Sequence, residues 1–383
     1  MDKRVYLLTA IAFVVGMVEL IIGGILDLVS EDLGVSVGQA GLLITVFALV
    51  FGISGPTLLY LSGQADRRRV ALVALVVFIA GNAVAVFAGS YAMLLLARII
   101  AAASGALLTV LSLTLAAHIT EPAHQGRAIG LVVMGISGSI VLGLPIGVSM
   151  GHALGWRSPF ILVILLAALL TAGVGRFFGT ISTAPPAPLS VQVAALRDKR
   201  IVFAHLTTFL FIAGHFTLYG YLTPFVVQTM AFGGTAITAV YFAYGAAAVS
   251  GGGLAGTFTD KYGPRRTLLT ATAFLVLCLL AIPNATGSPV TFWAVLVIWG
   301  ILSWAITPPI QTHLVRLAPE TSSIQQSLNN SVLHLGIALG TFAGSMVVDR
   351  SSVEHNALVG AVLVILALGA AFVTLQKERE AVP

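Results

Sequence analysis

Long apolar runs separated by short polar segments fill the chain from end to end. A helix rises about 1.5 Å per residue, so roughly 20 apolar residues cross the ~30 Å hydrocarbon core of a bilayer. We predict twelve membrane-spanning helices from these runs. Their ranges are Val5–Leu26, Val37–Leu61, Val70–Ala88, Ala92–Ile119, Ala128–Leu154, Pro159–Gly175, Ile201–Val227, Ala236–Phe258, Thr267–Ile282, Val290–Val315, Ser323–Val348 and Ala357–Leu375.

Composition places the chain in the same class. It is 58% hydrophobic and 9% charged, whereas a soluble domain carries about 25% charged residues. We therefore predict an all-α integral membrane protein embedded in a lipid bilayer. The single cysteine, Cys278, lies in an apolar run, so neither a disulfide nor a cysteine-based metal site is expected.

Positive charges fall unevenly between the predicted loops. With both termini placed in the cytoplasm, only Arg157 and Arg350 of the 19 Lys and Arg residues lie in outer loops. Basic residues favour the cytoplasmic side of a membrane. We predict a multi-pass protein of a bacterial-type inner (cell) membrane, with both termini cytoplasmic. The basic residues are dispersed over many loops, so no nucleic-acid partner is expected.

Glu19 and Arg98 are the only Asp, Glu, Lys or Arg residues inside the predicted spans. A charge at bilayer depth costs roughly 3 kcal/mol or more, so it persists mainly when it is paired or functional. The two residues lie at similar predicted depth, so helix geometry allows them to meet. One interpretation is that the Glu19 carboxylate carries a proton beside Arg98, which keeps its charge. The alternative is a permanent ion pair that only joins two helices.

The sequence lacks the patterns of the common catalytic and ATP-binding sites. It contains neither His-Glu-x-x-His nor Gly-x-Ser-x-Gly. It also lacks the adjacent Gly-Lys pair of a phosphate-binding loop, because none of its lysines follows a glycine. We therefore expect no enzyme, no cofactor and no bound metal. For transport by such a membrane protein, a proton gradient is therefore a simpler energy source than ATP.

The chain divides once, in a proline-containing segment. We predict an N-terminal six-helix bundle at residues 1–178, a cytoplasmic linker at 179–200 and a C-terminal six-helix bundle at 201–383. A loop pattern recurs in the two parts. The second part has Gly256-Thr-Phe-Thr-Asp260-Lys-Tyr-Gly263-Pro-Arg265-Arg266, and the first has Gly63-Gln-Ala-Asp66-Arg67-Arg68-Arg69. This repetition indicates two pseudo-symmetric halves.

The loop of the second half resembles the GxxxDxxGxRR pattern of the major facilitator superfamily, through Asp260, Gly263, Arg265 and Arg266. The first-half copy, with Asp66 and Arg67, is compressed and lacks the second glycine. The resemblance implies the twelve-helix major facilitator fold and a gating role for both loops. A solvated basic loop would explain the arginines but not the repeated Asp and Gly. We expect a monomer.

The fifth predicted span is rich in glycine and carries Gly143-Leu-Pro145, followed by Trp156-Arg157. This pattern resembles the glycine-proline helix of drug:proton antiporters. The spacing of one residue between glycine and proline is similar to the sugar-efflux and purine-efflux branch. Physically, the proline frees a carbonyl group and bends the helix, while the glycines let helices approach closely.

Three further segments resemble bacterial purine efflux permeases: Gly16-Met-Val-Glu19 in the first span, Ala213-Gly214-His215 to Tyr219 in the seventh, and Trp299-Gly300 to Trp304 in the tenth. The resemblance implies a proton-coupled antiporter that exports purine bases or nucleosides by alternating access. A multidrug or sugar efflux antiporter and an uncoupled facilitator are the alternatives, because a fold does not determine a substrate.

Several side chains are suited to bind a planar heterocycle as the small-molecule substrate. Aromatic faces stack on such rings, and amides or imidazoles form hydrogen bonds with their edges. The candidates are His215, Tyr219, Trp299, Trp304, Asn330 and His334. His215 is also the second candidate, after Glu19, for carrying the coupled proton. Packing between helices is the alternative role for each residue.

Overall fold

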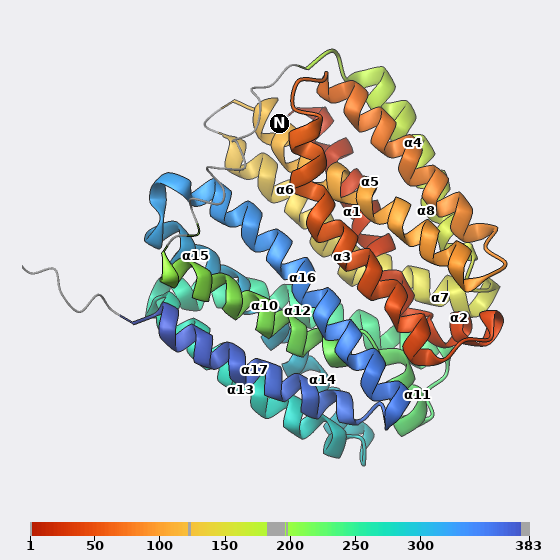
Figure 1. The fold of residues 1–383 in the computed structure, drawn as a ribbon, viewed down its shortest axis with the longest axis vertical. Coiled ribbons are helices and arrows are strands. Elements are labelled where there is room, and N and C mark those ends of the chain that lie inside the picture. The colour runs from red at the N-terminus through yellow and green to blue at the C-terminus, as the bar shows by residue number, and fades with distance from the viewer. Residues whose placement is uncertain (1, 122–123, 182–195, 197, 377–383) are drawn as a thin grey trace, which may run out of the picture.

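The computed structural model of the protein describes residues 2–121, 124–181, 196 and 198–376. In these ranges all regular secondary structure is helical, and twelve helices are long and apolar enough to cross a membrane (Figure 1). The predicted all-α fold with twelve spans is therefore confirmed. Most of the predicted linker, including its three prolines, lies outside the described residues.

The first four spans begin at residues whose side chains cap the helix. Ser36 and Gln39 form a reciprocal capping box at the start of the second span, and the Asp66 and Ser90 side chains cap the third and fourth. The elements are α1 (Lys3–Gly24), α2 (Leu26–Leu33), α3 (Val37–Leu61), α4 (Arg67–Val86), α5 (Tyr91–His118), α6 (Gln125–Gly138), the π-helical turn η2 (Ser139–Gly143), α7 (Leu144–Leu154) and α8 (Ser158–Phe177).

The second six spans repeat this order. A short helix again follows the first span, because α10 is followed by α11 as α1 is followed by α2 (Figure 1). The elements are α10 (Lys199–Tyr219), α11 (Leu222–Met230), α12 (Gly234–Tyr262), α13 (Pro264–Ala285), α14 (Pro289–Trp304), α15 (Thr307–Leu317), the single turn η3 (Pro319–Thr321), α16 (Ser322–Arg350) and α17 (His355–Thr374).

Several predicted spans differ from the observed helices, and two of them show the clearest interruptions. The range Val290–Val315 contains two helices, α14 and α15, which are interrupted at Ala305 and Ile306. Pro308 and Pro309 lack backbone N–H groups, so the hydrogen-bond ladder of α14 cannot continue through them. The range Ile201–Val227 likewise contains the end of α10 at Tyr219 and most of the separate helix α11.

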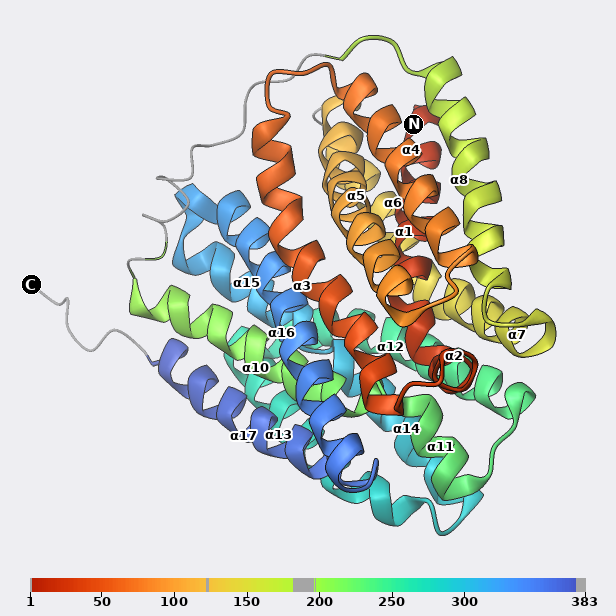
Figure 2. The same cartoon turned by 45° about the vertical axis from the view of Figure 1, so that its right-hand side comes forward.

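Helices α3 and α16 lie side by side and join the two six-helix groups (Figures 1 and 2). The hydrogen bonds between them cluster at the end of the bundle where α1 ends and α3 begins, which we call the far end. Asp349 Oδ1 accepts from the Gly38 N–H at 3.1 Å, and Ser345 donates to the Gly38 carbonyl at 2.9 Å. Tyr241 of α12 donates to the Gly23 carbonyl at 3.0 Å. These contacts close the far end of the interface.

Candidate functional site

A cavity of about 260 Å³ lies between the two groups of helices. Its walls come from α1, α3, α5, α6 and η2 on one side, and from α10, α14, α15 and α16 on the other. The lining is mostly apolar, with a few polar side chains set into it. A concave, largely apolar space with few polar groups is the usual form of a small-molecule site.

Glu19 of α1 meets His334 of α16 at the wall of this cavity. The Glu19 Oε1 atom lies 3.2 Å from His334 Nε2, and the two side chains are 17% and 8% exposed. His334 Nδ1 lies 2.8 Å from the Asn330 carbonyl, so Nδ1 carries a proton. The Nε2 contact then also requires a proton, held either by the imidazole or by the carboxyl group. The pair therefore connects the two halves through one shared proton.

Arg98 does not form with the Glu19 carboxylate the ion pair that the sequence allowed. Its guanidinium donates to the Val18 carbonyl at 2.8 Å and to the Glu19 carbonyl at 3.2 Å. It also lies over the Phe47 ring, 3.9 Å from the centroid, and is 1% exposed. Arg98 thus meets the main chain of Glu19, where it fastens α5 to α1. Equal depth in the membrane did not specify which side of α1 the guanidinium would reach.

His215 lines the cavity, but both of its ring nitrogens already have partners in the protein. Trp299 Nε1 donates to His215 Nδ1 at 3.1 Å, and Tyr244 Oη lies 3.0 Å from His215 Nε2. Indole N–H is only a donor, so Nδ1 is unprotonated and Nε2 carries the proton. The Tyr244 hydroxyl in turn donates to Ser303 at 2.7 Å. This chain of hydrogen bonds holds His215 in one neutral tautomer, which argues against a role as proton carrier in this state.

The six predicted substrate residues separate into two groups. His215, Trp304, Asn330 and His334 line the cavity. Tyr219 and Trp299 lie behind His215 within the second half, where Tyr219 stacks on the His215 ring with centroids 5.1 Å apart and Trp299 is fully buried. Spacing along the helix alone did not show whether Tyr219 and Trp299 face the cavity or pack against neighbouring helices.

Sequence reasoning missed several polar and aromatic residues of the lining. Phe51 stacks on the His334 ring, with centroids 4.3 Å apart. Asn329 donates to Thr208 at 2.9 Å and contacts His205. Gln311 of α15 also lines the cavity. It lies seven positions after Trp304, and this helical spacing was the signal that could have found it.

The glycine-proline span contains a distortion at the predicted position. The π-helical turn η2 ends at Gly143, and Pro145 lies at the start of α7. Proline cannot donate to the preceding turn, so the helical ladder widens there. Both η2 and α7 contact α12 of the other half. At this contact a Cβ on Gly245 would lie 2.7 Å from the Ile140 carbonyl oxygen, so glycine permits the close approach.

The two predicted gating loops form different contacts. Asp66 Oδ1 accepts from the N–H groups of Arg68 and Ile181, at 3.2 and 2.8 Å. Arg67 donates to the Ser62 and Gly63 carbonyls. The first-half loop is thereby tied to the chain segment after α8. In the second-half loop, Gly263 has φ +83°, which glycine adopts most readily, whereas Asp260, Arg265 and Arg266 are exposed.

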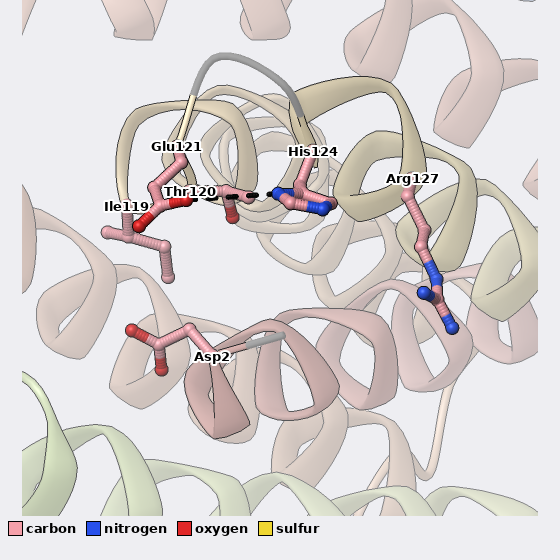
Figure 3. Close-up of a pocket in the computed structure, with 6 residues that line it drawn as sticks. All are labelled: Asp2, Ile119, Thr120, Glu121, His124 and Arg127. Atoms are coloured by element: carbon pink, nitrogen blue, oxygen red, sulfur yellow. Dashed lines mark ion pairs between the residues drawn. The ribbon is translucent and has the colours of Figure 1, made fainter.

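A second pocket of about 360 Å³ lies on the surface between the start of α1 and the connection from α5 to α6 (Figure 3). Asp2, Glu121 and His124 are drawn at its rim, and the Glu121–His124 pair is 3.9 Å apart. The side chains of His124 and Glu121 are 61% and 86% exposed. Charges so open to water interact weakly, so this pocket lacks the features of a built site. Among the described residues, no group of three or more His, Cys, Asp or Glu residues is arranged to hold a metal ion.

Comparison with known proteins identifies relatives along almost the whole chain. The family model of the Major Facilitator Superfamily matches residues 8–341. The uncharacterized MFS-type transporter YbcL of Bacillus subtilis (strain 168) is 33% identical over 377 residues, which cover 98% of this chain and 96% of YbcL. A probable sugar efflux transporter of Mannheimia succiniciproducens is 28% identical over 362 residues, which cover 94% of this chain and 90% of that protein.

Solved structures share the fold. Two crystal structures of a bacterial homologue of the human lysosomal transporter Spinster are similar to this chain, both in inward-facing conformations. The unoccupied one has a TM-score of 0.80 at 17% identity, covering 98% of each chain. The occupied one has a TM-score of 0.81 at 15% identity, covering 98% of this chain and 97% of the other. At such identities the likeness concerns the fold alone.

Proposed function

We propose that this chain, which belongs to the Major Facilitator Superfamily, exports a small organic molecule from the cytoplasm in exchange for protons. The observation that carries the proposal is the Glu19–His334 contact, which joins the two halves at the wall of the central cavity. A protonatable pair placed between the moving halves can couple the charge state of the pair to their separation. We further propose a monomer in a bacterial inner membrane, with both termini in the cytoplasm.

The number of protons on this pair determines how strongly the halves attract each other. With one proton, Glu19 and His334 form either an ion pair or a neutral hydrogen bond. A second proton leaves a neutral carboxyl group beside an imidazolium, so the attraction between opposite charges is lost. Proton binding would therefore favour separation of α1 from α16 at this point. The reverse step, loss of a proton, would favour their return.

Arg98 has a supporting role in this scheme. Its charge does not titrate, and its hydrogen bonds to the Val18 and Glu19 carbonyls fix the part of α1 that carries the carboxylate. The Glu19 side chain is then held on the cavity side of α1. We keep Glu19 as the proton carrier, add His334 as its partner, and assign Arg98 to positioning.

A purine base or nucleoside is the substrate that we propose. Phe51, Phe216 and Trp304 give the cavity aromatic walls, and Asn330 adds an amide. A flat heterocycle presents apolar faces to such walls and hydrogen-bonding edges to the few polar groups. Several other polar groups of the lining, such as Asn329, are bonded within the protein.

A sugar is the second candidate substrate, because a relative of similar length is named a probable sugar efflux transporter. A sugar carries several hydroxyl groups, and each needs a partner when it leaves water. The mainly apolar lining favours the heterocycle. Drug export and uncoupled diffusion are further outcomes that the experiment below can report.

Reconstituted vesicles test the proposed function. Purified protein in liposomes is given an outward or inward pH gradient, and uptake of radiolabelled adenine, hypoxanthine, arabinose and chloramphenicol is followed. We expect purine accumulation that follows the direction of the gradient and stops when an uncoupler removes it. Transport of arabinose or chloramphenicol alone would replace the substrate, and purine transport that ignores the gradient would remove the proton coupling.

A further inference from the structure

Gln311 has a polar atom that lacks a partner. It lies on α15 and lines the central cavity. Its Oε1 atom is buried and accepts no hydrogen bond from the described residues. Leaving a buried carbonyl unpaired is unfavourable, and most buried polar groups in folded proteins are hydrogen-bonded, so this oxygen requires an explanation. A ligand in the cavity that donates a hydrogen bond would supply the missing partner.

The neighbouring polar groups of the cavity are not in the same position. His215 is bonded at both ring nitrogens, Asn329 donates to Thr208, and His334 is held by Glu19 and the Asn330 carbonyl. Gln311 therefore stands out as the cavity-lining carboxamide whose oxygen is buried without a hydrogen-bond partner. The long, flexible glutamine side chain allows the amide to turn toward a ligand.

We propose that Gln311 is a substrate-recognising residue and that its carboxamide binds the edge of a 6-aminopurine. This inference rests on the proposed function and names the substrate class more closely. A carboxamide presents one acceptor and one donor side by side. It pairs with adenine through two hydrogen bonds, accepting from the N6 amino group and donating to N7, as glutamine does in nucleic-acid recognition. Trp304 also lines the cavity and offers an aromatic surface on which a base can stack.

The chemistry predicts an order among purines. Adenine satisfies both groups of the amide. A 7-deazaadenine ring lacks the N7 acceptor, and N6,N6-dimethyladenine lacks the amino donor. Hypoxanthine has an oxygen at position 6, so its N7 edge presents two acceptors and leaves Oε1 unpaired. Each of these three ligands is expected to bind more weakly than adenine.

The test measures the binding of these four purines to the full-length protein in detergent, by calorimetry and by thermal stabilisation. Gln311→Met keeps the length of the side chain and removes its hydrogen bonds. We expect this variant to bind adenine about five-fold or more weakly, and to lose the preference for adenine over 7-deazaadenine. Gln326→Met is the matched control, because Gln326 is exposed on α16 and is outside the cavity lining, so its affinities should equal those of the wild type.

A second variant keeps the experiment decisive if Gln311→Met is not monodisperse. Gln311→Glu preserves an acceptor for the N6 amino group and removes the donor to N7, so adenine should lose its advantage over 7-deazaadenine. An unchanged preference for adenine in both variants would overturn the role of Gln311 and leave the proposed function standing. If the wild type binds arabinose and no purine, the proposed substrate and this inference both fall. In either case proton coupling is measured separately by transport.

Discussion

Glu19 Oε1 lies 3.2 Å from His334 Nε2, and this contact joins two residues that lie more than 300 positions apart in the sequence. The two side chains belong to different halves of the fold. The carboxylate therefore has a titratable partner across the interface, where the sequence had suggested a permanently charged one within its own half. The contact can break whenever the halves separate, which is the property that a coupling group needs.

His334→Asn should weaken the contact between the halves and alter the pH dependence of transport. If the two side chains interact, the double variant Glu19→Gln/His334→Asn will lose less stability than the sum of the losses in the two single variants. Direct contacts of this kind show coupling energies of about 0.5 to 3 kcal/mol. Thermal unfolding of the four proteins gives this energy, and strictly additive values would show that the residues do not interact.

Arg98→Lys should lower stability even though the charge is kept. The guanidinium fork donates to two carbonyl groups of α1 and lies over Phe47, whereas an ammonium is a compact charge that cannot match this geometry. We expect a lower midpoint of thermal unfolding and a larger loss for Arg98→Leu. Unfolding followed by tryptophan fluorescence measures both. A midpoint equal to that of the wild type in Arg98→Leu would remove the structural role.

Gly245→Ala should disturb the contact of α12 with η2. The added Cβ would lie 2.7 Å from the Ile140 carbonyl oxygen and 3.0 Å from the Val141 Cα, and main-chain atoms cannot easily move aside. Overpacking of this kind costs about 1 to 3 kcal/mol. Gly252→Ala is the control, because Gly252 lies on the same helix and an added Cβ there would meet open space. Equal unfolding midpoints for the two variants would contradict the close approach.

Asp32 of α2 contributes stability that depends on pH. A hydrogen bond from Trp156 and the charge of Arg157 lower the pKa of its carboxyl group below the ordinary value of 3.8. The folded pKa is below the unfolded one, so the contribution is complete above the unfolded pKa and disappears as the pH falls through the folded pKa. Asp32→Asn should therefore lower the unfolding midpoint at pH 7. The difference from the wild type should shrink below about pH 4, and a constant difference would exclude this cause.

The sequence was sufficient for the membrane helices because hydrophobicity and length decide them. The predicted range Val37–Leu61 equals the bounds of α3. The other predicted ranges agree with the observed helices within a few residues, except where a helix is interrupted. The interruption at Ala305 and Ile306 was missed because both residues are apolar. Pro308 and Pro309 carried the relevant signal, since they prevent α14 from continuing.

The site was only partly predictable, because sequence gives depth in the membrane more readily than direction around a helix. Glu19 and His334 were both candidates, but nothing in their spacing indicated that they touch across the two halves. Tyr219 was expected to face the substrate and instead stacks behind His215. Gln311 was not selected, although its position relative to Trp304 would have placed it on the cavity side of that span.

Transport by wild type and Glu19→Gln in proteoliposomes tests proton coupling through Glu19. The amide keeps the shape of the side chain and removes its titration. We expect the variant to lose adenine accumulation driven by a pH gradient, while exchange of internal for external adenine without a gradient continues and the protein stays monodisperse. Gradient-driven accumulation at the wild-type level in Glu19→Gln would show that Glu19 does not carry the coupled proton.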